Sequence, residues 1–172
     1  MSRPGHRARA VIGAALAAGL LAGCGSHPHP GRDPLLLIPT PDAVVVKTGT
    51  VPGLGTIVTD GQGRTLYMFP PDAGSTVRCT GACAGTWPPL VIANGHTATG
   101  QGQINPADLG TIADPNTGAR IVTYGGYPLY RYAGDLAAGQ ANGQNLFSDG
   151  GPWYALHPDL QPVTVDPSGT SR

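Results

Sequence analysis

The sequence predicts a small, mostly β domain in which two related β-hairpin or meander units pack together, behind a signal peptide and a proline-rich tether. Three observations support this fold class. The 172-residue chain contains 27 Gly and 18 Pro, and no apolar pattern of helical period extends over ten residues or more. Short runs of alternating β-forming residues flank glycine-rich turns. One supersecondary phrase also occurs twice.

We expect four parts along the chain. Residues 1–23 read as a lipoprotein signal peptide, 24–50 as a lipidated cysteine with a proline-rich tether, 51–165 as the repeat domain and 166–172 as a disordered tail. Proline fixes φ and removes a backbone donor, so the tether is predicted to be extended. Its apolar runs "LLLI" and "VVV" are candidates to pack on the domain or to add an edge strand.

The leader predicts the compartment. Arg3, Arg7 and Arg9 precede the apolar run 11–23, which is too short to span a hydrocarbon layer of roughly 30 Å and is typical of a secretory signal. The run ends in "LAGC", which resembles a lipobox and predicts lipidation, with palmitate among the acyl chains, at Cys24. Acyl chains would then anchor the protein to the extracytoplasmic face of the cell membrane. The alternative is an ordinary secretory peptide in which the cysteine has no such role.

Charge argues against a nucleic-acid partner. The chain has 10 basic and 10 acidic residues, and three arginines leave with the leader, so seven basic groups face ten aspartates. No basic run follows Arg9, and nucleic-acid binding requires a concentrated positive surface.

The stretch "CTGAC" contains Cys79 and Cys83. Outside the cytoplasm, two nearby thiols usually oxidise to a disulfide, which is the predicted state. A redox-active dithiol and a metal pair remain alternatives, although zinc sites usually need a second pair of ligands. His27 and His29 form an H-x-H pair that is either a weak metal site or two solvated side chains.

The repeated phrase divides the domain into two units, at about 54–92 and 109–157. "LGTIVTDGQGRTLYMFPPD" begins at Leu54, and "LGTIADPNTGARIVTYGGYPLYRYAGD" begins at Leu109. Both begin L-G-T-I, reach an arginine and end in L-Y-x-aromatic-x-x-D, with the second interpreted as containing an inserted strand pair. A tryptophan entering a strand follows each phrase, at Trp87 and Trp153.

Two aromatic residues in each phrase are predicted to share one face of a strand. Side chains two positions apart point the same way in extended backbone, so Tyr67 pairs with Phe69 and Tyr130 with Tyr132. Together with a tryptophan, each pair would form an aromatic cluster in its own unit.

The aspartate of each phrase, Asp72 or Asp135, is predicted to accept hydrogen bonds from backbone N–H groups of the loop that follows it. In this interpretation the motif is structural. Two functional alternatives stay open: a redox relay of tyrosine and tryptophan beside a metal or haem partner, and a groove for a flat ligand or sugar lined by Tyr67, Tyr130, Trp87 and Trp153.

Several motifs together resemble one bacterial family. The lipobox, the repeated Y-x-[FWY]-x-x-D phrase, "CTGAC" followed by "WPPL", and G-x-P-L-Y are similar to the secreted-repeat lipoproteins with the Yx(FWY)xxD motif. The resemblance implies a surface-anchored β domain and no particular reaction. It assigns as motif positions Tyr67, Phe69, Asp72, Tyr130, Tyr132 and Asp135.

The usual catalytic motifs are missing from the sequence. It contains no G-x-S-x-G, no H-E-x-x-H, no phosphate loop and no dinucleotide-binding glycine pattern. We therefore expect no catalytic residue and no cofactor. The predicted function is that of a non-catalytic cell-envelope lipoprotein that binds an envelope protein or a small ligand. The alternative is an accessory protein for extracytoplasmic redox or metal handling, of copper or haem.

Overall fold

The first sheet begins upstream of the predicted domain boundary. A computed structural model describes residues 43–164, all within one compact unit. Strand β1 (Val44–Val51) pairs antiparallel with β2 (Gly55–Asp60) and parallel with β5 (Ala98–Gln101). The predicted end of the tether at residue 50 is therefore wrong, because the "VVV" run belongs to a central strand that is hydrogen-bonded on both sides. Residues 1–42 and 165–172, with the leader, Cys24, His27 and His29, lie outside the described residues.

The second sheet is built mainly from the second repeat. Its strand order is β4 (Val91–Ile92), β7 (Arg120–Tyr124) and β6 (Leu109–Ala113), and β8 (Tyr127–Pro128) also pairs with β7. Strands β7 and β8 pair across the diglycine Gly125–Gly126, in agreement with the predicted β-forming runs that flank glycine-rich turns. Gly125 and Gly126 have φ angles of 58° and 82°, as a tight two-residue turn between twisted strands requires.

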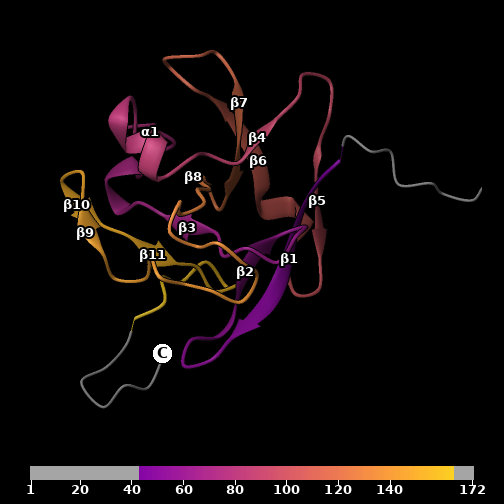
Figure 1. The fold of residues 1–172 in the computed structure, drawn as a ribbon. Helices are drawn as coiled ribbons and strands as arrows, with labels where there is room; N and C mark the ends of the chain where they lie inside the picture. The colour runs from indigo at the N-terminus through magenta and orange to yellow at the C-terminus, as the bar shows by residue number, and fades with distance from the viewer. Residues whose placement is uncertain (1–42, 165–172) are drawn as a thin grey trace, which may run out of the picture. The chain divides into compact units, whose positions relative to one another are not determined.

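The remaining elements are short (Figure 1). Strand β3 (Tyr67–Met68) pairs with β11 (Tyr154–Ala155), and β9 (Phe147–Ser148) forms a hairpin with β10 (Gly151–Pro152). The helical segments are η1 (Pro70–Asp72), α1 (Ala82–Thr86) and η2 (Pro106–Asp108). The prediction of a mostly β domain is confirmed.

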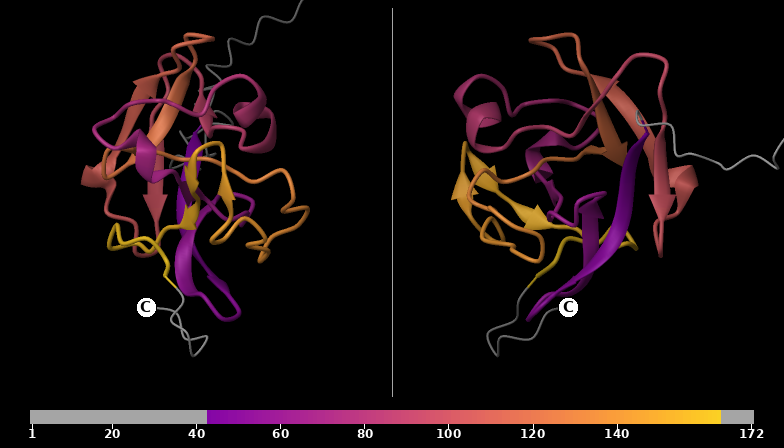
Figure 2. Two further views of the ribbon diagram at one scale, coloured as in Figure 1. Left: turned by 90° about the vertical axis from the view of Figure 1, so that its left-hand side faces the viewer. Right: turned by 45° about the vertical axis from the view of Figure 1, so that its right-hand side comes forward.

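The two repeats exchange the strands that follow their tryptophans. β4 of the first repeat pairs with β7 of the second, and β11 of the second repeat pairs with β3 of the first. The N–H of Val122 donates to the carbonyl of Leu90 at 2.8 Å, and the N–H of Val58 donates to Leu156 at 2.8 Å. Figures 1 and 2 show the yellow β11 lying beside the magenta β3, far from it in sequence. Each repeat thus completes the sheet of the other, so the predicted units are not self-contained.

The backbone contacts also correct the alignment of the two repeats. The N–H of Leu66 donates to Val58 at 3.0 Å, and the N–H of Leu129 donates to Val122 at 3.0 Å. Val58 of β2 and Val122 of β7 are therefore equivalent, and the counterpart of β6 is β1. The two L-G-T-I phrases are not equivalent, and the interpretation of an inserted strand pair is wrong. The strand that seemed extra in the second repeat has its counterpart in β1, within the segment assigned to the tether.

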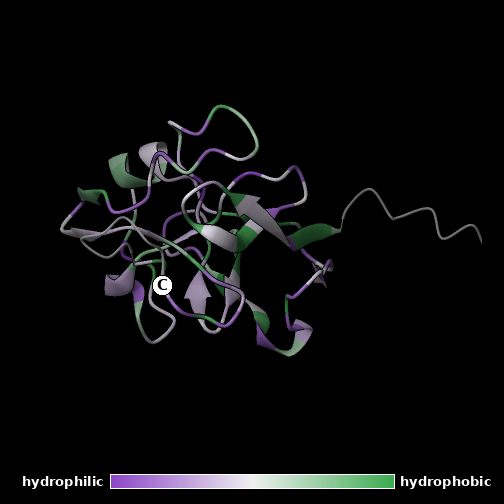
Figure 3. Ribbon diagram, turned by 90° about the horizontal axis from the view of Figure 1, so that it is seen from below, coloured by the Kyte–Doolittle hydropathy of each residue, from purple (hydrophilic) through white to green (hydrophobic). Residues whose placement is uncertain are grey.

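The two copies meet at their motif tyrosines. Tyr67 and Tyr130 exchange backbone hydrogen bonds of 2.8 and 3.0 Å in an antiparallel bridge, which gives the contacts around it an approximate two-fold symmetry. One core cluster surrounds the tryptophans, and a second contains aliphatic residues from both repeats. Figure 3 shows only short hydrophobic stretches, separated by hydrophilic ones. The core is thus assembled from many short segments, which include Val46, Val58, Leu66, Leu90, Val122, Leu129 and Leu156.

Candidate functional site

The tyrosine of each motif donates a hydrogen bond to the aspartate of the other motif. Tyr67 Oη lies 2.6 Å from Asp135 Oδ2, and Tyr130 Oη lies 2.5 Å from Asp72 Oδ2. All four residues are at most 3% exposed. The two bonds connect residues 68 and 58 positions apart in sequence, so a motif that reads as local is completed across the repeats.

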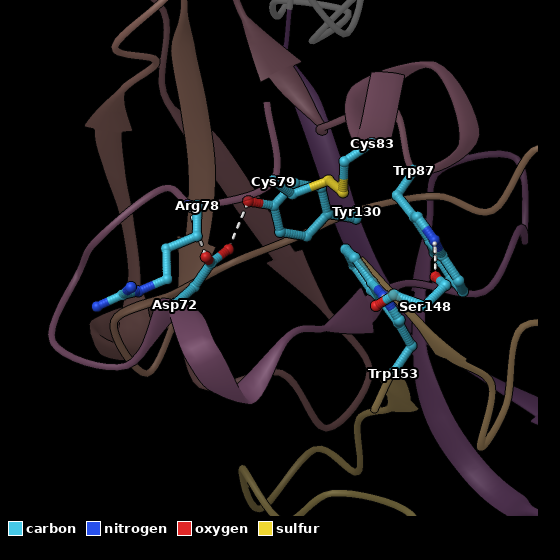
Figure 4. Close-up of a disulfide and its surroundings, with 8 residues drawn as sticks. All are labelled: Asp72, Arg78, Cys79, Cys83, Trp87, Tyr130, Ser148 and Trp153. Atoms are coloured by element: carbon cyan, nitrogen blue, oxygen red, sulfur yellow. Dashed lines mark hydrogen bonds between the residues drawn. A yellow bond between two sulfur atoms is a disulfide. The ribbon is translucent and has the colours of Figure 1, made fainter. Parts of the chain in front are cut away.

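The second oxygen of each carboxylate holds its own loop. Asp72 Oδ1 accepts from the N–H of Arg78 at 2.8 Å, and Asp135 Oδ1 accepts from the N–H of Asn142 at 2.7 Å. The structure thus contains the loop contacts expected for both aspartates. Figure 4 shows Asp72 between the Arg78 backbone and Tyr130. Each aspartate therefore joins the loop of its own repeat to the tyrosine of the other.

Burial sets the protonation of these groups. Burial, with the hydrogen bond to the partner aspartate, raises the pKa of Tyr67 and of Tyr130 well above the ordinary value of 10.0. Burial also raises the pKa of Asp72 above its ordinary value, although the bonds from Tyr130 and from the Arg78 N–H oppose that shift. At neutral pH both phenols are protonated, and each donates its hydroxyl hydrogen to an aspartate oxygen.

The aromatic rings form one shared series instead of one cluster in each unit. Trp87 and Trp153 stack with centroids 3.9 Å apart and planes 1° apart. Phe69 stacks on Trp153 at 4.4 Å, and Tyr132 packs against Trp87 at 4.5 Å. The prediction of an aromatic cluster in each unit is therefore wrong. Because the tryptophan strands are exchanged, the second aromatic of each motif packs on the tryptophan of the other repeat.

The edges of the two indole rings are also satisfied inside the domain. Trp87 Nε1 donates to the Ser148 hydroxyl at 3.0 Å, and Trp153 Nε1 donates to the Ser148 carbonyl at 3.3 Å. Trp87, Trp153, Tyr67 and Tyr130 are all fully buried, and of the motif aromatics Tyr132 alone is partly exposed. A ligand groove lined by those four rings is not formed.

The predicted disulfide is confirmed. Cys79 and Cys83 are bonded across a separation of 4 residues, and both are buried. Figure 4 shows the disulfide, which belongs to the same buried core cluster as Tyr130. The counterpart of Cys79 is Gly143, since each follows the residue whose N–H binds its aspartate. A Cβ on Gly143 would lie 2.8 Å from the Trp87 ring, so the second copy has no room for a disulfide.

A surface cleft of about 280 Å³ lies between β5 and β6. These strands are the edges of the two sheets. Arg120 lies in the cleft, where its Nη2 donates to Thr111 Oγ1 at 2.7 Å and its Nη1 to the carbonyl of His96 at 3.2 Å. Sequence reasoning missed this cleft, because it exists only where two sheets meet.

A second polar feature ties the two repeats together at the surface. Arg131 Nε lies 2.6 Å from Asp60 Oδ2, and Asp60 is only 1% exposed. Asp60 Oδ1 accepts from the N–H groups of Gln62 and Arg64. Strand periodicity places Arg131 on the face opposite the motif aromatics, but it does not indicate that its partner belongs to the first repeat.

The described part of the chain, residues 43–164, contains no group of three or more His, Cys, Asp or Glu placed to hold a metal ion. It also contains no helix with the length and apolar character that a membrane crossing needs.

The fold and its core define a β-repeat domain in which two copies of one motif share a single interior. The chain belongs to the family described as a secreted repeat of unknown function, whose sequence pattern matches residues 50–91 and 111–157. The resemblance to secreted-repeat proteins is thereby confirmed, and the family indicates an extracellular or cell-envelope location. No curated protein and no solved structure matches the chain.

Proposed function

We propose that the protein is a non-catalytic lipoprotein of the cell envelope, whose β domain binds an envelope protein or a small ligand. A lipid on Cys24 would hold it at the extracytoplasmic face of the membrane. The basic leader and the "LAGC" phrase support the anchor. The membership of a secreted family supports the location.

One observation carries the non-catalytic part of the proposal: the carboxylates of the motif are already hydrogen-bonded within the domain. The buried oxygens of Asp72 and Asp135 each accept a tyrosine hydroxyl or a backbone N–H. A general acid or base needs access to a substrate proton, within hydrogen-bond reach or through one water. These carboxylates lack such access, so the motif fits a rigid scaffold that presents its outer surface for binding.

The anchor is tested by metabolic labelling in a bacterial host with an alkyne-bearing fatty acid. We expect the wild-type chain to carry the label and to fractionate with membranes, and Cys24→Ser to lose both properties. The double variant Cys79→Ser/Cys83→Ser is the matched control and should keep the label. An unlabelled wild-type chain, or a labelled Cys24→Ser variant, would refute the anchor.

The binding part is tested by stabilisation, since a ligand that binds only the folded state raises the melting temperature. Fractions of envelope extract are added to the exported Cys24→Ser protein, and its unfolding is followed by tryptophan fluorescence. A saturable rise with one fraction is expected. If no fraction raises the melting temperature, even at concentrations high enough to saturate binding of ordinary envelope affinity, the result would count against a binding role.

A second candidate, a redox accessory, is favoured by the ring series. Aromatic contacts run from the partly exposed Tyr132 through Trp87 and Trp153 to Tyr130, with centroids 4.5, 3.9 and 5.2 Å apart. Tyr130 and the disulfide belong to the same buried core cluster. This candidate predicts an easily reduced disulfide, or an absorption band or bound metal in protein purified without chelator. A reduction potential below about −300 mV, typical of structural disulfides, with a plain aromatic spectrum would exclude it.

A further inference from the structure

The cleft between β5 and β6 has the size of a site for a small group. Its volume of about 280 Å³ is just below the range of roughly 300–1,000 Å³ that is usual for ligand pockets. It therefore suits one side chain or a chain terminus better than a large cofactor.

Arg120 gives this cleft a fixed positive charge. Its two hydrogen bonds go to the Thr111 hydroxyl and the His96 carbonyl, at 2.7 and 3.2 Å, and both acceptors are neutral. A guanidinium has five N–H donors, so three remain for a ligand. Within residues 43–164 the one ion pair is that of Arg131 with Asp60, so no carboxylate of the described chain forms an ion pair with Arg120. A planar guanidinium held in this way matches the two oxygens of a carboxylate.

The walls of the cleft favour a ligand that combines a carboxylate with an extended chain. Ala98, Pro106 and Leu109 supply apolar surface, and Thr97 adds a hydroxyl group. Because β5 and β6 are edge strands, they carry unpaired backbone N–H and C=O groups. Those are the groups with which a bound peptide pairs when it adds a strand to a sheet.

We propose that the β5–β6 cleft binds an extended peptide segment of an envelope partner, and that Arg120 holds a carboxylate of that peptide. The backbone edge of β5 or β6 aligns the peptide, and the charge selects an acidic residue. This inference rests on the proposed function of the domain in binding, and it names the site and the chemistry of the partner.

The test compares two capped peptides that differ in one group, N-acetyl-Ala-Asp-Ala-amide and N-acetyl-Ala-Asn-Ala-amide. Each is titrated into the ¹⁵N-labelled, exported Cys24→Ser protein, which keeps the rest of the mature chain. We expect the aspartate peptide to shift the amide signals of Ala98, Thr111 and their neighbours, and the asparagine peptide to leave them unchanged. Arg120→Gln should weaken binding about tenfold or more, because charge-assisted hydrogen bonds are lost. Arg64→Gln removes an exposed charge elsewhere and should leave binding unchanged.

Equal shifts with both peptides, no shifts at the cleft, or undiminished binding by Arg120→Gln would overturn the assignment. Sodium propionate is a third probe, and if it binds as tightly as the aspartate peptide, the peptide part is wrong. Should Arg120→Gln fail to fold, the comparison of the two peptides on the unsubstituted cleft still decides. The proposed binding function is tested separately, by stabilisation with envelope fractions, so its failure and the failure of this cleft assignment are distinguishable.

Discussion

At the residue scale, two phenol hydroxyls connect the repeats. Each is buried, and each donates to a carboxylate that comes from the other copy of the motif. The spacing within the motif follows from this arrangement: the tyrosine, the second aromatic and the aspartate each have a different partner. The residues of the motif therefore join the two repeats to each other.

Double-mutant cycles test the crossed pairing. Tyr67→Phe should reduce the free energy of unfolding by about 1.5–3 kcal/mol, the usual value for a hydrogen bond to a charged group. Combined with Asp135→Ala, it should show a coupling energy of about 0.5–3 kcal/mol. Urea denaturation of the single and double variants gives these values.

The aspartate of the same repeat is the control for that cycle. Tyr67→Phe with Asp72→Ala should be additive within about 0.5 kcal/mol, because Tyr67 makes no hydrogen bond to Asp72. Coupling to Asp72 with none to Asp135 would show that the pairing is not crossed.

The pKa of Asp72 gives a pH dependence with a definite sign. Burial raises this pKa above the ordinary value of 3.8, so between the two values the folded state binds more protons than the unfolded state. The contribution of Asp72 to the free energy of unfolding must then fall as pH rises through that interval, and level off above it. Asp72→Asn removes the titration. The free energy of unfolding of the wild type minus that of the variant should therefore decrease with rising pH.

This difference is measured by chemical denaturation from about pH 3 to about pH 8. Asp149→Asn, which removes one charge from an exposed residue, corrects for the change in net charge. A difference that increases with pH would mean that the pKa is lowered in the folded state, contrary to what we infer from its burial.

At the scale of elements, local signals were sufficient for the hairpins. The diglycine between β7 and β8 and the turn after Asp60 each join two segments that are adjacent in sequence. Turn chemistry alone therefore predicts these hairpins. The short disulfide could also be predicted, since its cysteines are close in sequence.

The choice of partner strand could not be predicted in this way. Leu90 and Leu156 both lie in short apolar strands after a tryptophan, and nothing local indicates that each bonds to the other repeat. The "VVV" run was expected at most to pack on the domain or to add an edge strand, and the central position of β1 could not be predicted for a related reason. Its valines follow a proline-rich segment, and their strand character depends on two partners, one of which is β5.

The disulfide has no counterpart in the second copy, because the sequence contains no cysteine after Cys83. It closes a loop of five residues, Cys79–Cys83, for which the loss of unfolded-state entropy corresponds to about 2 kcal/mol. Cys79→Ala/Cys83→Ala should lower the free energy of unfolding by that amount or more, since both sulfurs are buried. Reduction of the wild-type protein should have a similar effect in urea denaturation. Unchanged stability in both experiments would refute a structural role.

At the scale of the whole molecule, the exchanged strands make the two repeats interdependent. We expect fragments 43–103 and 104–164, cut beside the exposed turn at Gly102, to remain unfolded separately. Each lacks the strand that completes its sheet, β11 or β4. Mixed in equal amounts, they should recover the near-UV circular dichroism of the stacked tryptophans.

Amide spectra provide the second readout for the fragments. Poor dispersion is expected for each fragment alone and native dispersion for the mixture. A well-dispersed spectrum from either fragment as a monomer would show that one repeat folds by itself.

The exchange also determines when in its synthesis the domain can fold. Cys79 and Cys83 are close enough to bond as soon as both meet an oxidant, whereas Tyr67 must wait for Asp135, 68 residues later. Val58 must wait longer, for Leu156. Contacts of such wide sequence separation slow folding, and here they postpone it until almost the last strand is present. For a secreted chain, the consequence is that the polypeptide has no complete core until synthesis of the domain is nearly finished.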